Sequence, residues 1–164
     1  MDPRELRARL SGLMSFPVTP FRPDGEVDVV RLREHVETQL GTPAQSIFAA
    51  CGTGEMFSLT LDEHVTVVKA TVQAAMDASK PVVAGIGYGT SIAISMAKAA
   101  ESAGAAGVLV LPPYLVSAEQ EGLFEHYRRI AESVSIGVIP YQRGGYTVTP
   151  KRRYASLKSR TSLV

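Results

Sequence analysis

Residues that build covalent or metal-held structures are scarce in this sequence. It has one cysteine, Cys51, and three histidines, so no internal disulfide can form and no Cys/His cluster has zinc-ligand spacing. The 17 basic and 16 acidic residues leave a net charge of +1, which gives no indication of a nucleic acid or a membrane surface as a partner. We expect neither a metal nor a cofactor.

Long apolar runs are also missing. No run approaches the roughly 20 residues that span a bilayer, and the segment from Met1 to Glu5 lacks the apolar core of a secretory signal. These two absences predict a soluble, cytoplasmic protein with no membrane partner.

Short apolar runs, by contrast, recur along the 164 residues, of which 45% are apolar and 20% charged. Most of the runs are continuous rather than alternating, which predicts strands buried on both faces of a parallel sheet. This composition suits a single globular domain over residues 1–164. The predicted strands cover residues 13–18, 46–51, 82–86, 107–111 and 136–139.

Helical patterns accompany these strands. Asp2 predicts the cap of a helix over residues 3–10, ahead of the first strand, and Asp28 caps a second helix. Thr60 and Glu63 have the spacing of a capping box, which opens a third helix. The apolar stripes predicted for the second and third helices are Val29, Leu32, Val36 and Leu40, and Val65, Val68, Val72 and Met76.

Three further helices are predicted towards the end of the chain. One begins at Thr90 or Ser91, with Gly104 just beyond its end. Another begins at a second capping box, Ser117 to Gln120, ahead of an apolar stripe, and Pro150 predicts the first turn of the last helix. That stripe is Leu123, Phe124, Tyr127 and Ile130.

The predicted order, one helix followed by five βα units, fits two architectures. A doubly wound sheet of five strands would be complete at this length, and the pattern alone slightly favours it. A (β/α)₈ barrel typically needs about 250 residues, so the chain would hold five of its eight units. Residues 161–164, Thr-Ser-Leu-Val, resemble the start of a sixth strand, which leads us to expect a truncated chain.

Chemistry-bearing motifs follow the strands, where parallel α/β folds bind their ligands. After the second strand, Gly52 and Gly54 flank Thr53, so backbone N–H groups and a hydroxyl can approach a small anion. A tight turn without a ligand explains this pattern equally well. The glycine-rich segment 85–90 is weak evidence for a dinucleotide site and is more typical of structural glycines.

Two tyrosines follow the fourth and fifth strands. Tyr114, after Pro112-Pro113, is placed to relay a proton or shield a site, or to pack as a loop aromatic. Tyr141 stands where a barrel strand aims a side chain into the mouth, and its hydroxyl can exchange a proton with a substrate. A core tyrosine is an equally good interpretation of Tyr141.

Nucleophile constellations are not supported. His35, His64 and His126 all fall on predicted helices, where we expect them on solvent faces and not paired with a strand-end serine or cysteine. Cys51 is predicted to be a small buried residue.

Taken in order, the strand-end motifs resemble the dihydrodipicolinate synthase/N-acetylneuraminate lyase superfamily from Gly12 to Val164. Gly-Thr-Gly-Glu at residues 52–55, in place of the Gly-Thr-Thr-Gly-Glu of the synthases, makes the sequence most similar to the 5-dehydro-4-deoxyglucarate dehydratases of that superfamily. The other matching segments are 16–21 (FPVTPF), 84–90 (AGIGYGT), 112–115 (PPYL), 120–123 (QEGL) and Tyr141.

This resemblance implies a truncated (β/α)₈ barrel of the class I aldolase type and a Schiff-base lyase. The implied reaction converts 5-dehydro-4-deoxyglucarate to 2,5-dioxopentanoate, water and carbon dioxide, with no cofactor. By the same resemblance, Thr53 and the backbone of Gly52 and Gly54 hold the carboxylate of the keto sugar acid, Tyr141 shuttles a proton, and Tyr114 belongs to the catalytic group. A homotetramer is implied for the full-length protein.

Two departures from the family pattern stand out. Residues 142–146 read Gln-Arg-Gly-Gly-Tyr, where the family usually has Asn-Arg followed by Asp-Asn, and this region would decide between the dehydratase and another aldolase or synthase of the superfamily. The Schiff-base lysine is missing and is expected just after Val164. The chain's own lysines fall on helices or before a strand, so we expect this chain alone to be inactive, and a non-catalytic α/β fragment remains an alternative. These lysines are Lys69, Lys80, Lys98, Lys151 and Lys158.

Overall fold

A computed structural model describes residues 1–112 and 119–142. The predicted helix at Pro150 and the predicted start of a sixth strand lie outside these ranges. The described elements, in chain order, are α1 (Pro3–Arg9), β1 (Met14–Ser15), α2 (Val29–Leu40), β2 (Ser46–Ala49), the 3₁₀ turn η1 (Met56–Ser58), α3 (Leu61–Ala75), the 3₁₀ turn η2 (Met76–Ala78), β3 (Val82–Ile86), α4 (Thr90–Ser102), β4 (Gly107–Val110), α5 (Gln120–Ser133) and β5 (Gly137–Pro140).

The strands form one parallel sheet in the order β1-β2-β3-β4-β5. Each strand therefore pairs with the next one along the chain. A doubly wound sheet reverses its strand order at a switch point, whereas a (β/α)₈ barrel does not. The fold is α/β with the strand order of the barrel, and the doubly wound alternative is wrong.

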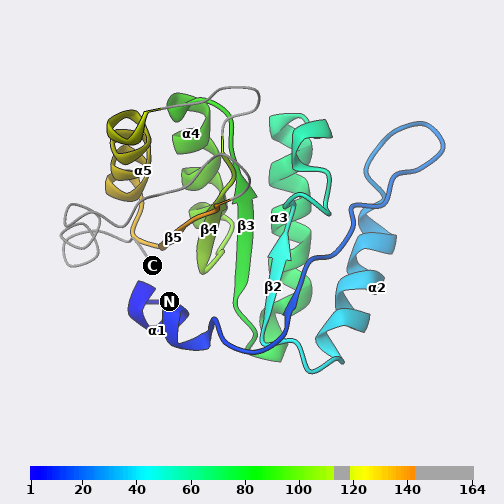
Figure 1. Ribbon diagram of the computed structural model, residues 1–164. Coiled ribbons are helices and arrows are strands. Elements are labelled where there is room, and N and C mark those ends of the chain that lie inside the picture. The colour runs from blue at the N-terminus through cyan, green and yellow to red at the C-terminus, as the bar shows by residue number, and fades with distance from the viewer. Residues whose placement is uncertain (113–118, 143–164) are drawn as a thin grey trace.

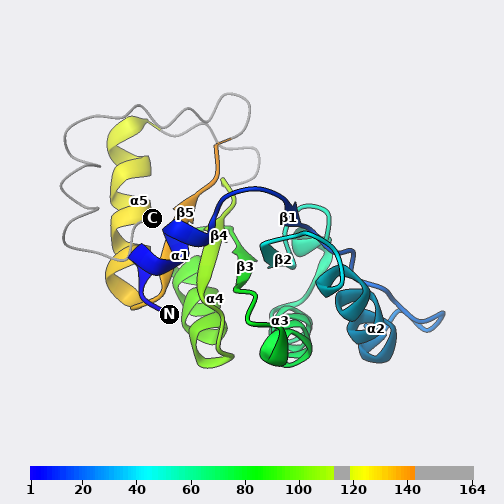
Figure 2. The same ribbon diagram turned by 90° about the horizontal axis from the view of Figure 1, so that it is seen from below.

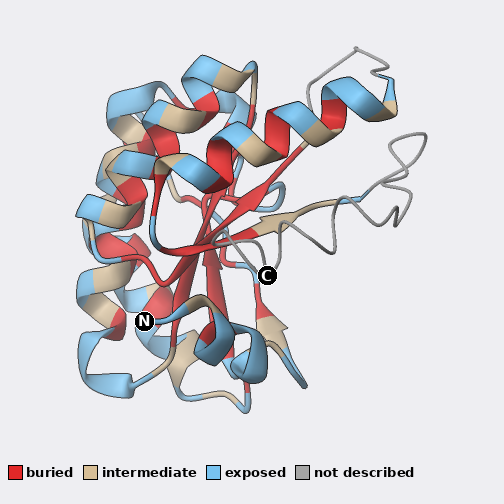
Figure 3. Cartoon of the chain, turned by 90° about the vertical axis from the view of Figure 1, so that its left-hand side faces the viewer, coloured by how far each residue is buried: buried red, intermediate tan, exposed pale blue. Residues whose placement is uncertain are grey.

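The two faces of the sheet are covered differently. Seen from below, the strands form a curved wall with α2 to α5 along its outer side (Figure 2), and the largest apolar cluster lies between this side and the helices. The inner side carries a smaller cluster that includes Phe48, Val83 and Leu109. Figure 3 shows the strands buried along most of their length.

Helix α1 lies at the lower end of β5 (Figure 1). Its Leu6 is fully buried and belongs to the inner cluster. A methyl group on Gly107 would come within 2.5 Å of the Leu6 side chain, so the absence of a side chain at Gly107 lets Leu6 fill the bottom of the inner side. The helix thus covers the end of the sheet opposite the strand C-termini.

Three predicted helix starts are confirmed. Asp2 accepts a hydrogen bond from the Arg4 N–H at 2.7 Å, and Asp28 accepts one from the Arg31 N–H at 3.0 Å. The capping box at Thr60 is present with both of its hydrogen bonds. Gly104 follows the cap of α4 with a φ of +92°, a left-handed conformation that glycine adopts without steric cost.

The start of the fifth helix differs from the prediction. Helix α5 begins at Gln120 with Glu119 as its N-cap, and the Glu119 side chain makes no capping hydrogen bond. Ser117 lies outside the described residues, so the second predicted capping box stays a prediction. Leu123, Tyr127 and Ile130 are buried as predicted. Their spacing places them on the same face of the helix, whichever residue the helix begins at.

The buried face of α3 also differs from the prediction. Val68 is buried, but Met76 is 68% exposed and the buried face includes His64, Val67 and Thr71 instead. Helix α3 ends at Ala75 and a 3₁₀ turn follows, which takes Met76 off the helical period. Within the described residues, no helix combines the length and apolar character needed to span a membrane.

Candidate active site

The C-terminal ends of the five parallel strands lie along one edge of the sheet, and the predicted motifs follow them there. Parallel α/β folds bind ligands at this edge because the connecting loops converge on it. The turn after β2 spans residues 50–55, the loop after β3 spans residues 87–89, and Tyr141 follows β5. The candidate site is built from these segments and from the chain after β1.

The turn after β2 leaves the sheet through two left-handed residues, Ala50 with φ +47° and Glu55 with φ +61°. Between them Gly52 and Thr53 are exposed, whereas Gly54 is buried. The turn is closed by the Glu55 N–H, which donates to the Gly52 carbonyl at 3.2 Å. The hydroxyl of Thr53 makes no hydrogen bond to another described residue and is free to meet a ligand.

Thr19 fixes the buried end of this turn. Its hydroxyl donates to the Gly54 carbonyl at 2.7 Å, and Thr19 is 7% exposed. A methyl group on Gly54 would lie 3.0 Å from the Ala50 Cα and 3.1 Å from the Pro17 carbonyl oxygen. No role was predicted for Thr19 from the sequence, although it lies in the matching segment 16–21. The one indication in the sequence was that Thr19 directly follows the first predicted strand.

The end of β3 packs directly against the same turn. A methyl group on Gly85 would lie 2.2 Å from the Ala50 carbonyl oxygen and 2.7 Å from the Cys51 Cα. Such a contact is shorter than any real Cβ makes, so glycine is required at this position. The interpretation of residues 85–90 as structural glycines is supported at Gly85.

Beyond β3, two aromatic side chains tie the loops together. The Tyr88 hydroxyl donates to the Phe57 carbonyl at 3.2 Å, and the two rings meet edge to face with centroids 5.3 Å apart. Tyr88 has a φ of +67°, which is costly for a residue with a side chain. These contacts hold the 87–89 loop against η1.

Tyr141 lies half-buried after β5. It packs against both the outer and the inner apolar clusters, and its N–H donates to the Val110 carbonyl at 3.0 Å. Ile139, two residues earlier on β5, packs on the inner cluster. Tyr114 and residues 143–146 lie outside the described residues, so their predicted contributions stay predictions.

The prediction of solvent-exposed histidines is wrong for two of the three. His64 is 1% exposed and its Nε2 lies 2.7 Å from the Gly85 carbonyl oxygen, while His126 is 8% exposed and its Nδ1 lies 2.9 Å from the Thr90 hydroxyl. Burial lowers the pKa of both imidazoles, because desolvation disfavours the charged form. Both are buried because each has a hydrogen-bond partner inside the fold.

Cys51 is buried as predicted, and its thiol is inert. It is 1% exposed, and burial raises the pKa of the thiol to about 12, so the reactive thiolate is not populated at neutral pH. Among the described residues, no group of three or more His, Cys, Asp or Glu is arranged to hold a metal ion.

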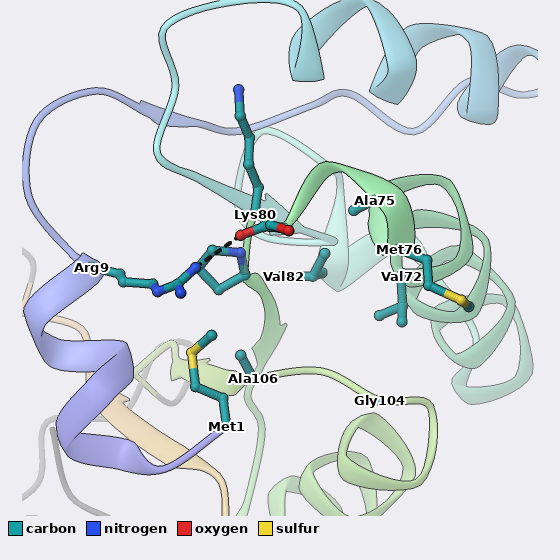
Figure 4. A pocket seen from close by; sticks show the side chains of 11 residues that line it. Met1, Arg9, Val72, Ala75, Met76, Lys80, Val82, Gly104 and Ala106 are labelled. Atoms are coloured by element: carbon teal, nitrogen blue, oxygen red, sulfur yellow. Dashed lines mark hydrogen bonds between the residues drawn. The ribbon is translucent and has the colours of Figure 1, made fainter.

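A pocket of about 350 Å³ lies at the opposite end of the sheet, beside the start of β3 (Figure 4). Arg9 donates to the Ser79 carbonyl at 2.9 Å, and Lys80 points away from the pocket and donates to the carbonyls of Leu40 and Thr42 at 2.7 and 2.8 Å. Both cations therefore tie backbone segments together, which is typical of the stability face of a barrel. The other described lysines, Lys69 and Lys98, are exposed on α3 and α4.

Comparison with known proteins agrees with this geometry. The sequence profile described as the dihydrodipicolinate synthetase family matches residues 9–152. The chain belongs to this family. A protein from Chelativorans sp. (strain BNC1) named probable 5-dehydro-4-deoxyglucarate dehydratase is 49% identical over 144 residues, which cover 87% of this chain and 47% of that protein.

Solved structures of the dihydrodipicolinate synthetase family superpose on the chain. The dihydrodipicolinate synthase of Bacillus clausii gives a TM-score of 0.86 at 30% identity, covering 97% of this chain and 53% of that one. The chloride-inhibited dihydrodipicolinate synthase of Acinetobacter baumannii, solved in complex with pyruvate, gives 0.76 at 36% identity, covering 84% and 47%. The chain spans about half the length of the relatives it matches.

Proposed function

We propose that this chain forms the carboxylate-binding part of the active site of a lyase, a decarboxylating dehydratase. The reaction converts 5-dehydro-4-deoxyglucarate to 2,5-dioxopentanoate, water and carbon dioxide through a Schiff base. The observation that carries the proposal is the exposed pair Gly52 and Thr53, which presents a free hydroxyl at the strand C-termini of a family member.

The turn suits one end of this substrate. The substrate has a keto group beside a carboxylate, and a carboxylate accepts hydrogen bonds from the hydroxyl of Thr53 and from backbone N–H groups of Gly52 and Gly54. Gly52 has open space where a side chain would be, which lets a ligand approach the backbone closely. A family member solved with bound pyruvate, the simplest acid of this kind, supports this choice.

Tyr141 is proposed as the proton shuttle. Its hydroxyl can take a proton from, or return it to, an oxygen of the reacting carbon, and its contact with the inner cluster after β5 supports this role. Tyr114 is proposed as a second catalytic tyrosine by resemblance. The amine that forms the Schiff base is not among the described residues, whose lysines all lie away from the strand C-termini.

A second candidate is a synthase or aldolase of the same family that acts on a pyruvate-derived enamine. The solved relatives named as synthases favour it, but their identity to this chain is lower than that of the relative named as a dehydratase. The tetramer and the cytoplasmic location implied by the resemblance stay predictions.

The carboxylate site is tested by titrating the 164-residue chain with pyruvate and following the amide signals of Gly52 and Gly54 by NMR. We expect saturable shifts of these signals. Thr53→Val, which removes the hydroxyl, should raise the Kd about tenfold, the loss of roughly one charge-assisted hydrogen bond. Thr53→Ser keeps the hydroxyl and is the matched control. Equal affinities for all three proteins would exclude Thr53 from the site.

The reaction is tested on the polypeptide purified from its source cells at its native length. We expect release of carbon dioxide and of 2,5-dioxopentanoate from 5-dehydro-4-deoxyglucarate. Condensation of pyruvate with an aldehyde instead would establish the second candidate. Absence of both activities would show a non-catalytic member of the family.

A further inference from the structure

The imidazole of His64 has a defined hydrogen-bond role. It lies on the first turn of α3, is 1% exposed, and its Nε2 is 2.7 Å from the Gly85 carbonyl oxygen. A carbonyl oxygen only accepts, so Nε2 carries the hydrogen. The Nδ1 atom has no partner among the described residues, which leaves the bond to Gly85 as the single anchor of the ring.

This hydrogen bond lies beyond the point where N–H groups of β2 can pair with carbonyls of β3. The Pro81 carbonyl accepts from the Ile47 N–H at 3.0 Å, and pairing of β2 with β3 ends at Ala49 and Ala84. Alternate carbonyls of a strand face the same neighbour, so the Gly85 carbonyl also faces β2. There β2 has already turned away at Ala50, and the His64 imidazole supplies the missing donor.

Gly85 is also the residue against which the carboxylate-binding turn is packed. A methyl group on Gly85 would lie 2.2 Å from the Ala50 carbonyl oxygen and 2.7 Å from the Cys51 Cα, so there is no space for one. The chain from Ala50 to Thr60 leaves the sheet beside Gly85, and the helix that follows returns to Gly85 through His64. Both ends of the connection that carries Thr53 therefore contact the same residue, Gly85.

We propose that His64 is a positioning residue, which sets the conformation of residues 52–54 for binding a 2-oxo acid by holding the Gly85 carbonyl. The inference rests on the proposed function of that turn. A residue of helix α3 that does not touch the ligand would then control the affinity of the turn for the ligand.

The experiment compares three variants of the 164-residue chain by NMR, with pyruvate as the probe. His64→Leu fills a similar volume without a donor, and His64→Gln keeps an N–H near the position of Nε2. His126→Leu is the matched control, since it removes a buried imidazole that bonds Thr90 on the neighbouring unit. Long-range nitrogen–proton spectra of the unsubstituted chain report which ring nitrogen of His64 carries the hydrogen.

We expect the Nε2–H form of His64, a Kd for pyruvate about tenfold higher in His64→Leu, and recovery of most of the affinity in His64→Gln. His126→Leu should bind as the unsubstituted chain does. Equal binding by His64→Leu, or an Nδ1–H form of the ring, would overturn the inference.

Failure of the unsubstituted chain to bind pyruvate would count against the proposed function instead. The amide shifts of Gly52 and Gly54 in the free variants then decide the inference. They should be displaced in His64→Leu and restored in His64→Gln. Unchanged shifts in His64→Leu would show that the turn does not depend on His64. If His64→Leu does not fold, the comparison of His64→Gln with the unsubstituted chain, together with the ring form of His64, decides in the same way.

Discussion

The glycines of this chain differ in how much space surrounds the position of a side chain. At Gly85 an added methyl group would lie 2.2 Å from a backbone oxygen of Ala50, whereas at Gly122, on α5, there is open space within 4 Å. The backbone of Ala50 leads into the proposed binding turn and cannot move away without altering it. The two glycines are therefore a matched pair for testing how closely β3 and the turn are packed.

We predict that Gly85→Ala lowers the free energy of unfolding by about 3 kcal/mol, as overpacking against backbone does. Gly122→Ala should instead raise it by up to about 1 kcal/mol, because alanine favours the helix over the unfolded chain. Unfolding in denaturant measures both changes. A Gly85→Ala protein as stable as the unsubstituted chain would contradict the close contact.

His64 and Thr71 show why sequence reasoning misplaced part of the core. A period of apolar residues predicts which face of a helix is buried, and polar residues are assigned to the other face. Each of the two residues has a hydrogen bond inside the fold that makes its burial possible, His64 from Nε2 to the Gly85 carbonyl and Thr71 to the Val67 carbonyl at 2.9 Å. The partner of His64 lies on another element, and no local pattern in the sequence reports it.

Among the described helices, α3 has the most complete set of capping hydrogen bonds. The Glu63 carboxylate accepts from the Thr60 N–H at 2.7 Å and from the Thr60 hydroxyl at 2.8 Å, and the Glu63 N–H donates back to that hydroxyl at 3.2 Å. These hydrogen bonds to Thr60 hold the pKa of the Glu63 carboxyl below its ordinary value of 4.5. The same cap fixes the end of the connection that carries Thr53.

We predict that Thr60→Ala destabilises the protein by about 1 kcal/mol, the usual loss for an N-cap hydroxyl. Because folding lowers the pKa of Glu63, its contribution is fully present above pH 4.5 and is lost as the pH falls through the lowered value. Glu63→Gln should therefore flatten the acid side of the stability profile.

Asp62→Asn is the control for this profile, since it removes a charge from the same helical turn without removing a capping hydrogen bond. Thermal unfolding between pH 2.5 and 7 measures the effect. A Glu63→Gln profile that runs parallel to that of the unsubstituted chain would exclude this role of the carboxylate.

Local signals predict the elements well where the cause is local. The capping box at Thr60, the cap at Asp28 and the full extent of β3 are all confirmed. Helix α5 begins at Gln120, later than the spacing from Ser117 predicts, because such spacing alone does not show where the chain enters the helix. The candidate site was predicted as a set of strand ends, but the links through Thr19 and His64 arise only from the packing of distant elements.

For the whole molecule, the sheet leaves β1 and β5 each with one neighbour among the described strands. Beside β1, the side chains of Leu13 and Val18 are 57% and 49% exposed. An unpaired strand edge next to apolar side chains is a template for association. A barrel and a doubly wound sheet differ in the order of the strands within the sheet. The spacing of the predicted strands along the sequence does not reveal that order.

We predict that the 164-residue chain self-associates as its concentration rises, and that Leu13→Lys together with Val18→Lys suppresses this. Val30→Lys, at an apolar residue of α2 that is 68% exposed and away from the edge, is the control. Sedimentation over a range of concentrations measures the effect. Equal suppression by the control would point to net charge as the cause.

The pairing of every strand with the next one along the chain also bears on how the protein is made. Each new strand finds its partner in the unit that left the ribosome just before it, so the wall can grow in the direction of synthesis. Short sequence separation between partners favours fast pairing, and domains generally begin to fold from the N-terminal side during translation. Besides the edge of β1, the strand edge that is open at any moment is then the one nearest the ribosome, where the next strand pairs.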